Sequence, residues 1–298
     1  MAQIRANGID IEYAVYGQAD GVPLVLIHGF GQQLTAWPDE FLQALTDGGL
    51  KVVAYDNRDV GLSAKWDGQI PDFAGIAADL QAGRSPQIAY SLDDMAADAM
   101  GLLDALGITS AHVAGASMGG MIAQLAALNH PGKVRSLISI FSTTGDRSLP
   151  PATPEAHMAL LTKPEGDERA AVIAHVLQSR RAYASTGYPY DDELIAAQVG
   201  ASYDRMYYPE GTLRHWAAIL AAPPRTERLK ALDLPTLVLH GGADTLIRPA
   251  AGRHTAECIR GAEYREIEGW GHDLPLGVIP RIIGYMLDFV RRTEAARA

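Results

Sequence analysis

The chain has 298 residues, a length typical of one large domain or of one domain with a sizeable insertion. Its residues are 48% hydrophobic and 20% charged, a globular composition that excludes a disordered chain. The formal net charge is -10 and no basic stripe is present, which argues against a nucleic-acid partner, because phosphates call for clustered Lys and Arg.

The N-terminus and the lone cysteine bear on where the protein works. Residues 1–5 lack the apolar core of a signal peptide, and no stretch approaches the roughly 18 apolar residues of a membrane span. Cys258 is alone, so an internal disulfide is excluded and a reducing compartment is the default. We therefore expect a cytoplasmic protein with no membrane partner. The sequence leaves the oligomeric state open and allows a homo-oligomer.

Short apolar runs, separated by helical patterns, predict a mostly parallel sheet. Residues 9–15 alternate apolar with polar side chains and suit an antiparallel strand at the edge of the sheet. Most later runs do not alternate, which is typical of strands covered on both faces. A last strand is expected at 264–267. These covered runs span residues 24–27, 52–55, 111–114, 137–140 and 237–239. Because helices stand between the strands, we predict a doubly wound α/β fold.

Helix boundaries are marked by capping residues. Ser91 and Asp94 have the spacing of a capping box at a helix start, and Gly107 stands past the end of that helix. A helix beginning near Met118 should stop at Pro131-Gly132, and the apolar periodicity of residues 281–292 predicts the last helix.

The stretch from 149 to 228 breaks the alternation of strands and helices. It carries helical patterns such as 168–181 and 191–202, no strand pattern, and a Pro-Pro pair near each end. We therefore predict an all-helical cap at 149–228, inserted into a core of residues 1–148 and 229–298. Six of the twelve tyrosines lie in this insertion.

The strongest chemical signal is the G-x-S-x-G motif of residues 115–119, placed between an apolar strand and a helix. A serine in such a turn is held in a strained conformation that exposes its hydroxyl, and the helix N-terminus favours developing negative charge. The flanking glycines let the turn approach neighbouring backbone. This setting indicates that Ser117 is a nucleophile.

With this motif in place, the chain resembles the α/β-hydrolase fold family over nearly its whole length. The resemblance implies the order nucleophile, acid, base, which here gives Ser117, Asp244 and His272. Asp244 follows a strand end, where catalytic groups of open α/β sheets gather, and His272 lies in a glycine-rich turn. Asp146, after the preceding strand, and Asp273, beside the histidine, are the competing acids.

Two further loops carry the resemblance. The segment His28-Gly29-Phe30-Gly31 is similar to the family's oxyanion loop, which implies the backbone N–H groups of Phe30 and Met118 as donors to the anion. Residues 56–63 resemble a D-x-R-G-x-G-x-S loop with Asp59 in place of glycine, and we interpret Asp56 and Arg58 as a structural pair under the site. Together with residues 37–41 and 47–50, this variant is similar to the aclacinomycin methylesterase-like branch.

These residues predict a serine carboxylic-ester hydrolase that acts on a small to medium apolar ester through an acyl-enzyme. No metal or other cofactor is expected, because no zinc-type spacing and no G-x-G-x-x-G opening are present. Ser117 excludes the dehalogenase and epoxide hydrolase types, which use an aspartate nucleophile. C–C bond hydrolases, cofactor-free haloperoxidases and perhydrolases share the same three residues and stay open, as does a non-catalytic small-molecule receptor.

Overall fold

The structure is a computed structural model that describes residues 1–297, and it is built on one eight-stranded sheet. In spatial order the sheet runs β1-β2-β4-β3-β5-β6-β7-β8. The strands are β1 (Ala2–Ala6), β2 (Ile9–Tyr16), β3 (Val22–Ile27), β4 (Leu50–Tyr55), β5 (Ala111–Ala116), β6 (Val134–Ile140), β7 (Thr236–Gly241) and β8 (Glu263–Ile267). Strands β3 to β8 are parallel, which confirms the predicted doubly wound, mostly parallel sheet.

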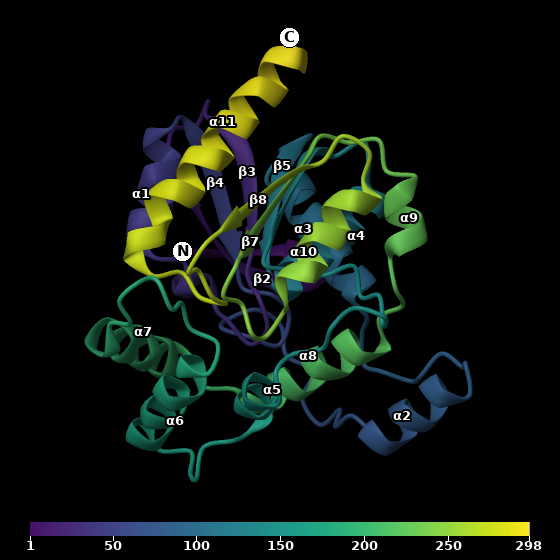
Figure 1. Ribbon diagram of the computed structural model, residues 1–298, viewed down its shortest axis with the longest axis vertical. Helices are drawn as coiled ribbons and strands as arrows, with labels where there is room; N and C mark the ends of the chain where they lie inside the picture. The colour runs from purple at the N-terminus through teal and green to yellow at the C-terminus, as the bar shows by residue number, and fades with distance from the viewer. Residues whose placement is uncertain (298) are drawn as a thin grey trace.

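Helices cover both faces of the sheet. They are α1 (Asp39–Asp47), α2 (Phe73–Gln81), α3 (Leu92–Ala105), α4 (Met118–Asn129), α5 (Pro154–Leu161), α6 (Arg169–Arg181), α7 (Asp192–Arg205), α8 (Pro209–Ala221), α9 (Thr226–Lys230), α10 (Pro249–Cys258) and α11 (Ile279–Arg297). Helices α1 and α11 lie on one face, and α3, α4 and α10 lie on the other (Figure 1). Each face has its own apolar core cluster, and the central strands are buried on both sides, as their unbroken apolar runs predict.

The antiparallel edge of the sheet differs from the prediction in one respect. Strand β2 is antiparallel to β4, as its alternating pattern indicates, but it is not the edge strand. Strand β1 pairs along its outer side, with Ile4 opposite Ile11. The five residues of β1 include exposed Gln3 and Arg5, so their sequence has too little apolar periodicity to reveal a strand.

The helix boundaries agree with the capping residues. Ser91 and Asp94 form a full capping box at the start of α3, and Gly107 follows that helix with φ of 68°. Helix α4 ends at Asn129, just before Pro131. Among the described residues, no helix combines the length and the apolar composition needed to cross a bilayer.

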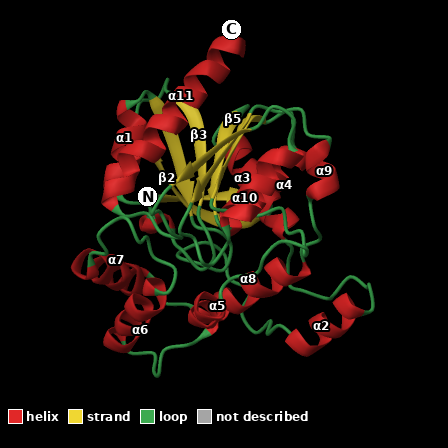
Figure 2. Ribbon diagram, viewed as in Figure 1, coloured by secondary structure: helices red, strands yellow, loops and turns green. Residues whose placement is uncertain are grey.

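The segment between β6 and β7 is helical and lies beyond one edge of the sheet. Helices α5 to α8 form a group below the strands, and α2 lies against α8 (Figure 2). The predicted end of the insertion, residue 228, falls inside α9, which packs on α10 and α4 instead of facing this group. The insertion begins after the carboxyl end of β6, which is a parallel strand. The helical group therefore covers the carboxyl ends of the parallel strands, where a site of this fold is expected.

Candidate active site

Ser117 occupies the sharp turn between β5 and α4. Its backbone has φ of 57° and ψ of -120°, a conformation that side-chain-bearing residues rarely adopt. The two glycines of the motif permit this turn. A Cβ on Gly115 would lie 2.0 Å from the carbonyl oxygen of Gly119, and a Cβ on Gly119 would lie 2.0 Å from that of Ile27. The predicted strain and its glycine requirement are both present.

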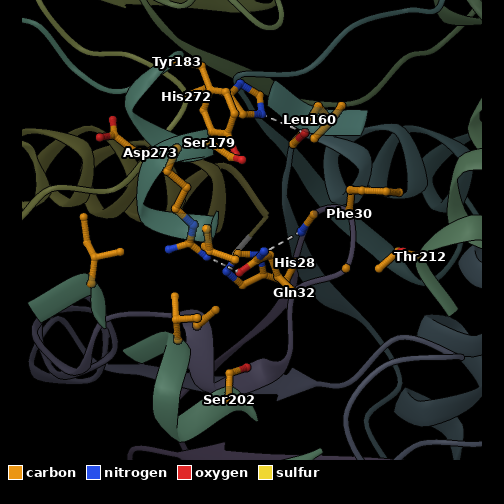
Figure 3. A pocket seen from close by; sticks show the side chains of 18 of the residues that line it. His28, Phe30, Gln32, Leu160, Ser179, Tyr183, Ser202, Thr212, His272 and Asp273 are labelled. Atoms are coloured by element: carbon orange, nitrogen blue, oxygen red, sulfur yellow. Dashed lines mark hydrogen bonds between the residues drawn. The ribbon is translucent and has the colours of Figure 1, made fainter. Parts of the chain in front are cut away.

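The structure brings together the three side chains that the sequence singled out. Ser117 Oγ lies 2.9 Å from His272 Nε2, and His272 Nδ1 lies 2.7 Å from Asp244 Oδ2. A carboxylate only accepts, so the imidazole carries its proton on Nδ1 and leaves Nε2 to accept the serine proton. Phe141 and Tyr183 contact the imidazole at ring-centroid distances of 4.6 and 6.1 Å, and Figure 3 shows Tyr183 beside His272.

Asp244 is the acid that reaches His272. Its side chain is buried, and its other oxygen accepts the N–H groups of Leu246 and Ile247, each at 2.9 Å, which holds the carboxylate in place. Asp146 instead accepts from the backbone and hydroxyl of Ser148.

A second histidine, His240, lies behind Asp244, at a position where the sequence indicates only a strand residue. Its Nε2 is 2.8 Å from the carbonyl oxygen of Ile247 and 3.6 Å from Asp244 Oδ2. Burial lowers the pKa of His240, so its neutral form neighbours the carboxylate.

The predicted oxyanion loop lies directly against Ser117. A Cβ on Gly29 would be 3.1 Å from Ser117 Cβ, and Phe30 and Met118 both line the same cavity as Ser117. The loop is braced by His215 of α8, whose Nε2 lies 2.8 Å from the carbonyl oxygen of Arg58. Its Nδ1 accepts the Gly31 N–H at 3.3 Å. This arrangement requires a neutral imidazole, and burial lowers the pKa of His215 to about 4.

The predicted Asp56–Arg58 pair is wrong. Arg58 donates two hydrogen bonds to Asp98 of α3, at 2.6 and 2.8 Å. Asp56 accepts from Arg205 of α7 at 2.7 Å and from the backbone of Leu34. The two side chains therefore pair with buried or largely buried partners on two different helices, α3 and α7.

The loop after β4 is thereby tied to the helical insertion. Arg205 also donates to Gln33, whose amide group donates to the carbonyl oxygens of Ser202 and Met206. The unusual Asp59 pairs with Arg214 of α8. Residues far apart in the sequence make these contacts, so no local pattern could have indicated them.

A cavity of about 1060 Å³ opens above Ser117 and His272. Five of the six tyrosines of the insertion line it, together with Trp216 and Met206, whereas Tyr188 packs on the apolar core. Several of these aromatics also hold the insertion together, since Tyr203 and Tyr207 stack at 4.8 Å and both donate to Asp167. The walls can therefore enclose a largely apolar molecule.

Comparisons with known proteins agree with this architecture. Residues 22–276 match the model of the alpha/beta hydrolase fold family. The chain is 29% identical over 289 residues to a rhodomycin D methylesterase of Streptomyces sp. (strain C5), covering 88% of each chain. It is 25% identical to a non-heme chloroperoxidase of Streptomyces lividans, covering 96% of this chain and 98% of that one.

Solved structures show the same fold. The enol-lactonase from Burkholderia xenovorans LB400 superposes with a TM-score of 0.73 at 21% identity, covering 97% of this chain and 100% of that one. The family match covers most of the sequence, and the resemblance to methylesterases holds over most of its length. The chain therefore belongs to the alpha/beta hydrolase fold family and is an esterase-type hydrolase.

Proposed function

We propose that this protein hydrolyses carboxylic esters with Ser117 as nucleophile, His272 as general base and Asp244 as the acid that orients the imidazole. The observation that carries the proposal is the unbroken hydrogen-bonded chain between these three side chains, at 2.9 and 2.7 Å, beside a large cavity. Such a chain activates a hydroxyl that is otherwise a weak nucleophile.

The mechanism follows from the positions of the protons. His272 Nε2 accepts the hydroxyl proton while Ser117 Oγ bonds to the ester carbonyl carbon, and the carbonyl electron pair moves onto its oxygen. When this intermediate collapses, the alcohol leaves with the proton from His272. Water then attacks the acyl-enzyme while His272 accepts one of its protons, and His272 returns that proton to Ser117 Oγ as the carboxylic acid is released. Asp244 stabilises the imidazolium in both halves.

The backbone N–H groups of Phe30 and Met118 are the proposed oxyanion donors. Support comes from the contact of Gly29 with Ser117 and from the place of Met118 at the N-terminus of α4. Amides at a helix N-terminus favour negative charge, and one donor in a comparable site contributes about 3 kcal/mol to the transition state.

The proposed substrate is a small to medium apolar ester, and the proposed role of the insertion (149–228) is that of a cap that selects it. Support comes from the aromatic walls that the insertion adds to the cavity, and from a volume at the upper end of the range for small-molecule sites. The relatives named as methylesterases make methyl esters the first alcohol group to test.

A panel of p-nitrophenyl and methyl esters of graded acyl length tests the proposal, with Ser117→Ala as the matched variant. We expect turnover by the wild type, a loss of about 10⁶-fold in the variant, and covalent labelling of Ser117 by an organophosphonate. Turnover retained by Ser117→Ala would refute the nucleophile. Binding of esters without turnover would indicate a receptor, and activity that needs peroxide and halide would indicate a haloperoxidase.

A further inference from the structure

A short stretch of the helical insertion, residues 183–187, lies directly against the loop that carries His272, residues 269–273. The His272 N–H donates to the carbonyl oxygen of Tyr183 at 2.8 Å. The N–H groups of Thr186 and Gly187 both donate to the carbonyl oxygen of Gly269, at 2.9 and 2.8 Å. The insertion therefore bonds to the loop both at His272 and ahead of it.

The two backbones touch without intervening side chains. A Cβ on Gly271 would lie 2.5 Å from the carbonyl carbon of Ala184, and a Cβ on Gly187 would lie 2.9 Å from Gly269 Cα. Only glycine, which has no Cβ, permits two backbones to come this close. This close approach lets the insertion hydrogen-bond directly to the loop backbone at Gly269 and His272.

Ser185 stands at the centre of this contact. Its Oγ accepts the Gly271 N–H at 2.9 Å and donates to Asp273 Oδ1 at 2.5 Å. Its own N–H lies 3.2 Å from both oxygens of Asp273. A hydroxyl has one proton and two lone pairs, so the Ser185 side chain can accept from the Gly271 N–H and donate to the Asp273 carboxylate at the same time.

We propose that Ser185 is a positioning residue for His272, through which the helical insertion holds the base in register with Ser117 and Asp244. This inference rests on the proposed role of His272 as general base. The loop between β8 and α11 has two glycines just ahead of His272, and Gly269 has φ of 73°. Without the Ser185 hydroxyl, the Gly271 N–H before His272 and the Asp273 carboxylate after it each lose a hydrogen bond.

Asp273 depends on the same contact. Burial raises the pKa of Asp273, while the two kinds of hydrogen bond from Ser185 oppose that rise. Figure 3 shows the Asp273 side chain directed away from the imidazole of His272, and Ser185 is its hydrogen-bond partner. Asp273 therefore acts on the loop and not on the reacting atoms.

The test compares Ser185→Ala with Ser148→Ala in the full-length protein. Ser148 makes the same kind of bond to a neighbouring carboxylate, with its hydroxyl 2.7 Å from Asp146 Oδ1, and it does not line the cavity. A displacement of a catalytic group of about 1 Å lowers turnover by roughly 100-fold. We expect Ser185→Ala to lower kcat on a p-nitrophenyl ester by about 10- to 100-fold with KM within about threefold, and Ser148→Ala to leave both unchanged.

A second readout is independent of substrate. The proton between His272 Nδ1 and Asp244 should give a downfield proton NMR signal in the wild type and in Ser148→Ala, and a shifted or broadened one in Ser185→Ala. Ser185→Thr keeps the hydroxyl and should restore both kcat and the signal. If Ser185→Ala does not fold, Ser185→Cys replaces it, with the same expected direction in both readouts.

Each result decides the matter. Wild-type kcat and an unchanged signal in Ser185→Ala would overturn the proposal, as would an equal loss in Ser148→Ala or a change confined to KM. If the wild type hydrolyses no ester, the proposed function fails, but the NMR comparison still tests whether Ser185 holds His272.

Discussion

Asp59 and Arg214 form a buried ion pair that joins the loop after β4 to helix α8. Arg214 Nε and Nη2 donate to the two carboxylate oxygens at 2.7 and 3.0 Å, and the side chains of Asp59 and Arg214 are 0% and 1% exposed. Burial alone would raise the pKa of Asp59, but hydrogen bonds from Arg214, Tyr90 and Trp66 outweigh it and hold that pKa below its ordinary value. Arg214 of α8 is therefore one of the groups that keep the buried Asp59 carboxylate charged.

Removing one partner of this pair should destabilise the protein strongly. Arg214→Met leaves the Asp59 carboxylate buried without its cation, and we expect a loss of about 3–5 kcal/mol in the free energy of unfolding, measured by urea titration. The control is Arg260→Met, because the side chains of the Arg260–Asp233 pair are 80% and 86% exposed and should contribute less than about 1 kcal/mol. Equal stability of the two variants would contradict this interpretation of the pair.

The choice of acid is tested by two matched substitutions. Asp244→Asn removes the charge that orients His272 and should lower kcat by about 10⁴-fold. Asp146→Asn removes a charge that bonds to Ser148 and should leave kcat within about twofold, since a carboxylate orients the imidazole only by bonding to it. Steady-state kinetics on one chromogenic ester checks both. The reverse outcome would move the acid to Asp146.

The insertion should set the preference among esters. Trp216 lines the cavity and meets Phe30 edge-on at 6.2 Å, so Trp216→Ala enlarges the space beside the oxyanion loop. We expect the ranking of kcat/KM to move toward bulkier acyl groups. The change in transition-state free energy should be about 1–3 kcal/mol for each added methylene. Tyr285→Ala, on α11, alters an aromatic residue outside the cavity and should preserve the ranking. An unchanged ranking in Trp216→Ala would leave this residue with a packing role only.

Two histidines with lowered pKa values, His28 and His215, should make the fold sensitive to acid. Burial, assisted by the charge of Arg180, lowers the pKa of His28 to about 3, and burial lowers the pKa of His215 to about 4. Both values lie below the ordinary 6.5, so the unfolded chain binds more protons between these limits, and stability falls as the pH drops from about 6.5 toward 4.

The quantity to measure is the slope of the free energy of unfolding against pH. Each of the two groups should contribute up to about 1.4 kcal/mol per pH unit to the loss of unfolding free energy. Urea titrations at a series of pH values from about 7 to about 4.5 should show a shallower slope in His215→Gln than in the wild type. A slope that His215→Gln leaves unchanged would show that this histidine takes up no proton on unfolding.

The sequence alone was enough for the parallel strands of the sheet, the nucleophile turn and the membership of the family. Strand runs such as 111–114 and the glycines around Ser117 act through contiguous residues, so their pattern carries the local structure directly. The short edge strand β1 was not predicted from the sequence, because few of its residues face the core.

Tertiary structure alone decided which charges meet and what holds the site together. Asp56 and Arg58 are two residues apart yet bind Arg205 of α7 and Asp98 of α3, partners that only the packing of these helices brings to the loop. The hydrogen bonds that join Ser185 to Gly271 and to Asp273 span 86 and 88 positions of the sequence. Hydrogen bonds of this kind depend on distance in space and on burial, and neither is encoded in the neighbouring residues of the chain.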